Sequence, residues 1–271
     1  MSHTNASLGS AISSLVTSLT ASPLPAIEPT PTLPTSPAEL AKLIDHTLLA
    51  PASTLDQIRA VCAEAKQHGT ATVCVNSSLI PTVAAQLDGS GVKPIAVVGF
   101  PFGAANTQAK VAETQQAVRD GANEIDMVQN IGLLKSGEYL AVLSDIQAVV
   151  GAAAPSAIVK VIIETSLLTR DEIIASTYLT CLGGAAFVKT STGYGGGGAK
   201  EDDVRLMHAI AHLDGAPWNG NVKVKASGGI RSLDVVQRMV QNGAERVGAS
   251  GTKAILDEAM GNKPEAPKSD Y

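Results

Sequence analysis

The sequence has few aromatic residues, few cysteines and no long apolar run. Phe, Trp and Tyr make up 3% of the 271 residues, so the core must be built from aliphatic side chains and alanine. The three cysteines form no Cys-x-x-Cys pair, and an odd, sparse set does not make a disulfide framework. No stretch approaches the roughly 18 apolar residues of a spanning helix, and no basic, apolar leader opens the chain. We therefore expect free, buried thiols, no membrane association and a cytoplasmic location.

Concentrated positive charge is also missing. The formal net charge is −5, and no block of lysine or arginine stands out. Binding to a phosphate backbone needs a basic face, so the sequence argues against nucleic acid as a partner. A small anionic ligand needs only a few local donors and is compatible with this composition.

Residues 1–38 differ in composition from the rest of the chain. Residues 21–37 are rich in Pro, Ser and Thr and are typical of an extended linker. Before them, Leu8, Ile12, Leu15 and Leu19 recur at helical spacing, which predicts a short amphipathic helix that docks on the main domain or on a partner. We expect an N-terminal extension (1–38), one folded domain (39–260) and a C-terminal tail (261–271).

From residue 38 onward, short apolar or β-branched runs alternate with longer amphipathic segments, the pattern of parallel βαβ units. Eight such units in a chain of this length favour a closed TIM (β/α)₈ barrel over a doubly wound sheet. The expected strands are 43–47, 70–75, 95–100, 124–128, 158–164, 186–189, 222–225 and 246–249.

Lys189 follows the apolar run 185–188, so its amine would project toward the barrel interior or mouth. Burial lowers the pKa of an amine toward neutrality, and attack on a carbonyl requires a neutral amine. For a lone lysine at a strand end, exposure to solvent or pairing with a carboxylate is the favoured interpretation. Lys225 favours a nucleophile, because it occupies the equivalent place in the next strand, about 4.8 Å away. Lys223 shares its face, but Lys225 adjoins the glycine turn at the rim.

Asp126 lies among apolar residues in the strand 124–128. Its carboxylate could relay protons during imine formation or pair with a lysine, and the two roles are compatible.

Glycine-containing turns follow the sixth, seventh and eighth expected strands. In TIM barrels the loops after strands seven and eight commonly bind phosphate through backbone N–H groups. The sequence therefore predicts a phosphate site, with plain turns as the alternative. Its expected residues are Gly193, Gly228, Gly229, Gly248 and Ser250.

These segments together resemble the 2-deoxyribose-5-phosphate aldolase family over about residues 40–256. The resemblance is carried, in order, by Ile44-Asp45-His46-Thr47, Val97-Val98-Gly99-Phe100-Pro101, Glu124-Ile125-Asp126-Met127-Val128, Lys160-Val161-Ile162-Ile163-Glu164-Thr165, Phe187-Val188-Lys189-Thr190-Ser191-Thr192-Gly193 and Lys225-Ala226-Ser227-Gly228-Gly229-Ile230-Arg231.

The resemblance implies reversible cleavage of 2-deoxy-D-ribose 5-phosphate to acetaldehyde and D-glyceraldehyde 3-phosphate, a step of deoxyribonucleotide and carbohydrate breakdown. It implies Lys189 as the Schiff-base lysine, Lys225 as the neighbour that lowers its pKa, and Asp126 as the proton relay. It implies no metal or organic cofactor, a sugar phosphate as ligand, and a homodimer as a candidate assembly. The substrate contacts that it implies are Asp45, Thr47, Cys74, Lys160 and Thr192.

The sequence departs from the family pattern at three places. The run 194–198 is richer in glycine than the family requires, which predicts a looser lid near the phosphate. Gly251 stands where some members carry a serine, and residues 1–38 have no counterpart in the family core.

Two further motifs are weaker. Residues 193–198 satisfy Gly-x-Gly-x-x-Gly, but at the sixth strand rather than the first, which disfavours a dinucleotide site. His208 and His212 share a helix face with Glu201 and Arg205, and a solvated outer face is the preferred interpretation over metal ligation. The role of His46 is left open. The alternatives to the leading function are a Schiff-base aldolase for another sugar phosphate and a non-catalytic barrel that binds a phosphate metabolite.

Overall fold

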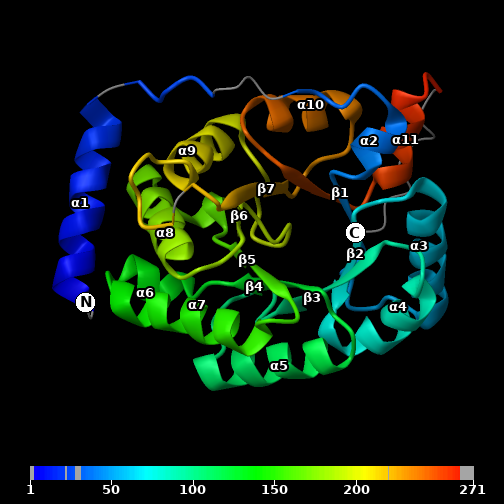
Figure 1. The fold of residues 1–271 in the computed structure, drawn as a ribbon, viewed down its shortest axis with the longest axis horizontal. Coiled ribbons are helices and arrows are strands. Elements are labelled where there is room, and N and C mark those ends of the chain that lie inside the picture. Colours follow the sequence, from blue (N-terminus) through cyan, green and yellow to red (C-terminus); the bar gives the residue numbers. More distant parts are fainter. Residues whose placement is uncertain (1–2, 22, 28–31, 219, 263–271) are drawn as a thin grey trace.

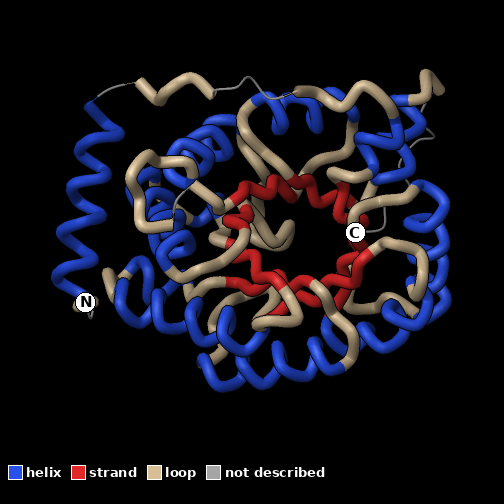
Figure 2. Tube along the Cα trace, viewed as in Figure 1, coloured by secondary structure: helices blue, strands red, loops and turns tan. Residues whose placement is uncertain are grey.

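The computed structural model describes residues 3–21, 23–27, 32–218 and 220–262. Within these ranges, eight parallel strands close into a barrel in chain order, and helices form an outer layer around it (Figures 1 and 2). The last strand, β8 (Arg246–Ala249), pairs with the first, β1 (Ile44–Thr47), and closes the ring. The predicted TIM barrel is confirmed.

The other strands lie where the sequence predicts them, with ends that differ by up to two residues. They are β2 (Thr72–Asn76), β3 (Lys93–Val98), β4 (Glu124–Val128), β5 (Ile158–Ile162), β6 (Phe187–Lys189) and β7 (Lys223–Ser227).

The helices that surround the barrel begin mostly at Ser, Thr or Asn caps, whose side chains accept a backbone N–H of the first turn. No described helix is both long enough and apolar enough to span a membrane. The helices are α1 (Asn5–Ala21), α2 (Pro37–Ala41), α3 (Leu55–His68), α4 (Ile80–Leu87), α5 (Thr107–Arg119), α6 (Ile131–Lys135), α7 (Tyr139–Ala153), α8 (Arg170–Leu182), α9 (Glu201–Ala211), α10 (Leu233–Gln241) and α11 (Thr252–Ala259), with 3₁₀ turns η1 (Ser77–Leu79) and η2 (Thr165–Leu167).

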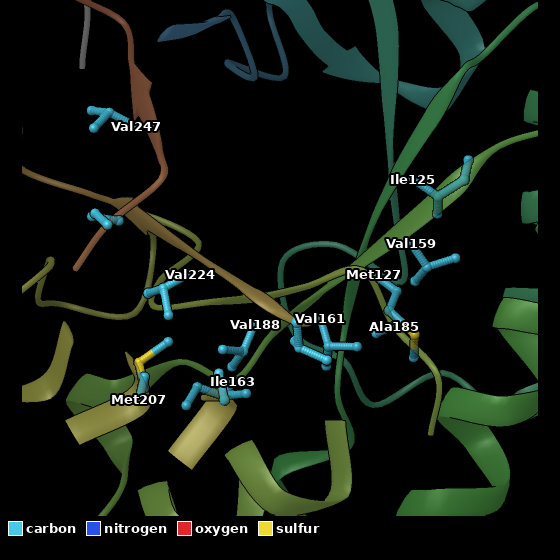
Figure 3. Packing of buried hydrophobic residues seen from close by; sticks show 14 of the residues in the cluster. Ile125, Met127, Val159, Val161, Ile163, Ala185, Val188, Met207, Val224 and Val247 are labelled. Atoms are coloured by element: carbon cyan, nitrogen blue, oxygen red, sulfur yellow. The ribbon is translucent and has the colours of Figure 1, made fainter. Parts of the chain in front are cut away.

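The main hydrophobic core lies between the strands and the surrounding helices. Successive strand residues point to opposite faces, so Ile125 and Met127 of β4 contribute to this outer core together with Val161 of β5 (Figure 3). The residues that alternate with them, such as Asp126 and Lys160, are left to fill the barrel interior. This alternation brings charged side chains together inside an otherwise aliphatic protein.

The barrel interior has an apolar part and a charged part. Leu49, Cys74, Ile95 and Val97 form a small separate cluster on the side of β1 to β3. Buried Asp, Glu and Lys side chains from β1 and β4 to β7 occupy the remainder. The functional chemistry is therefore confined to one part of the barrel.

Helix α1 lies on the outer surface of the barrel against α7 and α8, far from α2 in Figure 1. Leu8, Ile12 and Leu15 are buried, and the Asn5 side-chain oxygen accepts the Leu140 N–H at 2.9 Å. In the structure the helix docks on the main domain. The boundaries of the extension and of the tail stay predictions, and residues 28–31 and 263–271 lie outside the described residues.

Candidate active site

A cavity of about 450 Å³ opens at the C-terminal ends of β1, β6, β7 and β8. This is the end of the barrel at which TIM-barrel active sites lie. Eight of the predicted site residues line it, and five lie outside its lining. The lining residues are Thr47, Leu49, Lys189, Thr192, Gly193, Tyr194, Ser227, Gly228, Gly229, Ile230, Arg231, Gly248, Ala249 and Ser250.

A second cavity, of about 400 Å³, opens near the N-terminal ends of β6 and β7. Cys181, Trp218 and Val222 are among its lining residues, and the described residues around it include no charged side chain. It therefore offers none of the groups that the predicted chemistry needs, and the cavity at the C-terminal ends is the candidate site.

Lys189 ends β6 and brings its amine to the floor of this cavity. Its Nζ atom lies 2.8 Å from Asp126 Oδ2, and the side chain is almost fully buried. Burial lowers the pKa of the Lys189 amine below its ordinary value; Asp126 opposes this shift, and the charge of Lys225 adds to it. A lowered pKa increases the fraction of neutral, nucleophilic amine at neutral pH.

Lys225 is the direct neighbour of Lys189 on β7, where the two residues are Cα partners. Its Nζ lies 2.7 Å from Asp126 Oδ2 and 2.5 Å from Asp45 Oδ2. Burial alone would lower the pKa of Lys225, but the two carboxylates outweigh it and raise the pKa above its ordinary value. The neighbouring lysines are thus in opposite states, with Lys225 held charged and Lys189 pushed toward neutrality.

Asp126 joins the lysines. One carboxylate oxygen, Oδ2, accepts hydrogen bonds from both Lys189 and Lys225, and the other accepts from Lys160 at 2.8 Å. Burial by itself would raise the pKa of Asp126, but the three ammonium groups hold it well below the ordinary value. Asp126 is therefore ionised, and its Oδ2 bridges the two lysines.

Lys160 and Asp45 lie beneath the cavity rather than on its surface. Lys160 Nζ is 2.5 Å from Glu124 Oε2 and has no exposed area. Asp45 accepts from Arg246 at 2.7 Å and from the Thr72 hydroxyl at 2.7 Å. Asp45 is held ionised, because Lys225, Lys160 and Arg246 lower its pKa against the opposing effect of burial. Both residues support the site from below and are out of reach of a ligand in the cavity.

The charges of this cluster balance without Lys189. Among the described residues, the buried ion pairs join three cations to three carboxylates before Lys189 is counted. A proton on Lys189 adds a seventh charge with no partner of its own, in a place where an uncompensated charge is costly. The cations are Lys160, Lys225 and Arg246, and the carboxylates are Asp45, Glu124 and Asp126.

The remaining predicted substrate contacts separate into two groups. Thr47 and Thr192 line the cavity. Cys74 is buried in the apolar cluster with Ile95 and Val97 and does not line it. Burial raises the pKa of Cys74 to about 11, so this residue is a neutral thiol at physiological pH.

All five predicted phosphate-site residues line the cavity. Gly193, Gly228 and Gly229 have φ values of 87°, 86° and 75°, which side chains rarely adopt. Arg231 lines the same part of the cavity, and nothing in the sequence singles it out beyond its place in the motif 225–231. With Lys189 it is one of two cationic residues in the described lining.

The glycine-rich run after β6 packs closely against its neighbours at two positions, and the looser lid stays a prediction. A Cβ atom on Gly195 would lie 2.6 Å from the Glu164 carboxyl carbon, and one on Gly198 would lie 2.3 Å from the Gly228 carbonyl oxygen. Only glycine allows the loop after β6 to approach the ends of β5 and β7 this closely.

The histidines lie away from the cavity. His46 points outward from β1, where its Nδ1 is 2.8 Å from the Thr252 hydroxyl, and burial lowers its pKa to about 4. His208 stacks on His212 and is half-buried against Gly243, so the predicted solvated face is partly covered at His208. Within the described ranges, no three His, Cys, Asp or Glu side chains are grouped so that they could hold a metal ion.

A TIM barrel whose mouth presents a buried, pKa-lowered amine beside a charged lysine defines a class of enzymes that act on carbonyl compounds. A sequence model of the DeoC/LacD family aldolases matches residues 40–258. The chain belongs to this family.

Curated relatives agree with the match. The chain is 50% identical to deoxyribose-phosphate aldolase 2 of Staphylococcus aureus over 216 residues, which is 80% of this chain and 94% of that protein. It is 49% identical to the deoxyribose-phosphate aldolase of Halalkalibacterium halodurans over 220 residues, 80% of this chain and 95% of the relative.

Solved structures resemble the barrel and, in one case, the extension. A Coccidioides immitis structure assigned to the deoxyribose-phosphate aldolases has a TM-score of 0.88 and 42% identity, covering 96% of this chain and 99% of its own. The uncovered remainder is too short to contain residues 1–38, so that protein shares much of the extension. The tetrameric deoxyribose phosphate aldolase of Aeropyrum pernix has a TM-score of 0.75 and 32% identity, covering 82% of this chain and 92% of its own.

Proposed function

We propose that this aldolase cleaves 2-deoxy-D-ribose 5-phosphate reversibly to acetaldehyde and D-glyceraldehyde 3-phosphate through a Schiff base on Lys189. The names of relatives at about 50% identity support the substrate. The observation that carries the mechanism is the buried charge cluster, in which Lys189 is the surplus cation and also faces the cavity.

Lys189 is the nucleophile in this proposal. Its neutral amine attacks the aldehyde carbon of the open-chain sugar, and loss of water from the adduct leaves an imine. The charge of Lys225, held by Asp126 and Asp45, favours the neutral amine before attack. Lys225 therefore acts on the reaction through the pKa of its neighbour.

Carbon–carbon cleavage follows from the imine. The bond between the second and third sugar carbons breaks, and its electron pair moves into the imine to form an enamine. The proton of the third-carbon hydroxyl is released, and a proton is added to the enamine carbon. Asp126 Oδ2, within 2.8 Å of both lysine amines, offers a path for protons between Lys189 and Lys225. Hydrolysis of the resulting imine releases acetaldehyde.

The phosphate end of the sugar lies at the loops after β6, β7 and β8 in this proposal. Backbone N–H groups near Gly229 and Ser250 and the guanidinium of Arg231 are donors in the lining of that part of the cavity. Their separation from Lys189 orients the sugar, with its aldehyde at the amine. Thr47 and Thr192, which also line the cavity, are the candidate contacts for sugar hydroxyls.

Coupled detection of acetaldehyde and D-glyceraldehyde 3-phosphate from deoxyribose 5-phosphate tests the proposal. Lys189→Ala is the control and is expected to produce neither product. Faster cleavage of fructose 1,6-bisphosphate than of deoxyribose 5-phosphate would point to another sugar-phosphate aldolase, and no turnover of either sugar would point to a binding barrel. The homodimer and the cytoplasmic location stay predictions.

A further inference from the structure

Glu164 combines an unusual backbone conformation with a buried carboxylate. Its φ and ψ are 59° and 64°, and it is the one non-glycine residue with positive φ in the described ranges. Such a left-handed conformation is unfavourable for a residue with a Cβ atom and persists where the surrounding structure enforces it. Its side chain is only 2% exposed, and the proposed reaction has no use for it.

The backbone around Glu164 explains how this conformation is held. Ile163 donates its N–H to the carbonyl of Lys189, and Thr165 donates to the carbonyl of Thr190, both at 2.9 Å. The two donors are two residues apart on the β5 side, but the two acceptors are only one residue apart on the β6 side. In a regular parallel ladder the two spacings are equal. Glu164 is the extra residue of a bulge, a feature that redirects a side chain beside an active site.

The redirected carboxylate binds Thr192 at two points. Its oxygens accept the Thr192 backbone N–H at 3.2 Å and 3.4 Å, and Oε2 also accepts the Thr192 hydroxyl. The Thr192 hydroxyl oxygen in turn accepts the N–H of Tyr194 at 2.9 Å. Glu164 therefore fixes both the backbone and the hydroxyl of a residue that lines the cavity.

This arrangement determines what Thr192 can offer a ligand. A hydroxyl has one donor hydrogen and two acceptor lone pairs. The hydrogen is committed to Glu164 and one lone pair to Tyr194, so one acceptor position is left. Thr192 can accept a hydrogen bond from a ligand hydroxyl, and it has no donor for a phosphate or carbonyl oxygen.

The effect of Glu164 extends to the predicted phosphate loops. Gly195 packs directly on the Glu164 carboxyl group, and the Gly195 carbonyl accepts the Ser166 hydroxyl at 3.2 Å. Further along the same loop, Ala199 donates to the carbonyl of Gly228 at 3.1 Å. Moving Glu164 would displace the loop after β6, which contacts the loop after β7.

We propose that Glu164 is a positioning residue for the aldolase reaction, holding Thr192 as an acceptor for a sugar hydroxyl between Lys189 and the phosphate end. This inference rests on the proposed function. It also predicts a preference for substrates that carry a hydroxyl at that point, because a substrate without one would leave the last acceptor position of Thr192 unused.

The test uses Glu164→Gln in the full-length protein. A glutamine keeps the size of the side chain but lacks the negative charge and one of the two acceptor oxygens, so it holds the two Thr192 donors more weakly than a carboxylate does. We expect kcat/KM for deoxyribose 5-phosphate to fall about 10- to 100-fold, because misplacement of a contact group costs in this range. Borohydride trapping of acetaldehyde on Lys189 should stay within about twofold, because acetaldehyde has no hydroxyl for Thr192 to accept.

Three comparisons separate this inference from simpler explanations. Glu138→Gln, at an exposed site, makes the same charge change and should alter neither readout. In a Thr192→Val background, the further loss caused by Glu164→Gln should shrink to about twofold, since residues that act together are not additive. Glu164→Gly suits the left-handed backbone, so it should still fold and yet lose activity, because it removes the acceptor of both Thr192 donors.

Equal losses of cleavage and of trapping in Glu164→Gln would overturn the inference. It would also be overturned if Glu164→Gln cost as much activity in the Thr192→Val background as in the wild type, or if Glu164→Gly were fully active. Failure of the wild-type protein to trap acetaldehyde would instead reject the proposed function itself.

Discussion

Two groups of buried charges in this protein differ in balance and in access to a cavity. Between α5 and α7, Lys110 Nζ lies 2.6 Å from Asp145 Oδ2 and also donates to the Val128 carbonyl. One cation meets one carboxylate there, and neither residue lines a cavity described above. Inside the barrel, four cations meet three carboxylates among the described residues, and the fourth cation, Lys189, reaches the cavity.

The difference separates a structural ion pair from a reactive site. A buried lysine is unreactive when a carboxylate neutralises it and packing encloses it, as at Lys110. A lysine becomes nucleophilic where the charges of its neighbours already cancel, because its own proton then adds an uncompensated charge. Burial of a lysine alone would not distinguish Lys110 from Lys189; the surrounding charges do.

The largest expected effect comes from removing the surplus lysine. Lys189→Ala should lower kcat by about four orders of magnitude or more, because the described lining of the cavity holds no other amine that could form the imine. Lys189→Arg should be equally inactive, since a guanidinium stays protonated. Steady-state cleavage of deoxyribose 5-phosphate measures both. Lys223→Ala, at an exposed lysine of β7, is the matched control and should keep wild-type activity. A Lys189 variant with more than a tenth of the wild-type activity would contradict the account.

Removing the partner lysine should cost less activity but change the pH dependence. Lys225→Met leaves Asp126 and Asp45 with one cation fewer, so the pKa of Lys189 should rise and less neutral amine be present at pH 7. We expect kcat to fall about 100- to 1,000-fold. Because only the neutral amine reacts, the pH midpoint for borohydride trapping should move upward. A midpoint that stays in place or moves downward would refute the role assigned to Lys225.

The structural pair should respond in the opposite way. Lys110→Met leaves the Asp145 carboxylate buried without its cation and should lower the free energy of unfolding by about 3–5 kcal/mol. The activity of the folded enzyme should change little. Lys110→Met combined with Asp145→Leu should recover much of the stability, as measured by urea unfolding. A double variant no more stable than the single one would indicate that burial of an unpaired carboxylate is not the cause.

The smallest effects should come from charges at the base of the cluster. Glu124→Gln removes an anion and should lower the pKa of Lys189, whereas Arg246→Met removes a cation and should raise it. Shifts of about one pH unit or less are expected from charges that do not touch Lys189. The midpoint of trapping should move in opposite directions in the two variants. Equal shifts of one sign would rule out the charge-balance explanation.

Much of this architecture could be predicted from residue patterns. Strand alternation and the spacing of eight apolar runs are enough for the barrel, and a lysine in each of two neighbouring strands is enough to pair Lys189 with Lys225. The observed strand ends differ from the predicted ones because hydrogen-bond pairing between strands continues or stops according to the neighbouring loops. Thr70, for example, precedes β2 rather than opening it.

Depth and backbone strain could not be predicted. Lys160 and Cys74 have the parity of the barrel interior, but parity does not tell whether a side chain reaches the cavity or lies beneath it. Glu164 carries no sequence signal for a left-handed conformation, because the bulge arises from how β5 pairs with β6. The partial burial of His208 could not be predicted either, because helical spacing shows the face of α9 and not the neighbouring Gly243 that covers the ring.

The most direct measurement of the central claim is the pH dependence of acetaldehyde trapping, with mass spectrometry to locate the adduct. The account predicts that borohydride fixes the aldehyde on Lys189, with half-maximal trapping below the ordinary lysine pKa of 10.5. An adduct on Lys225 instead, or trapping on Lys189 that begins only near pH 10.5, would contradict it.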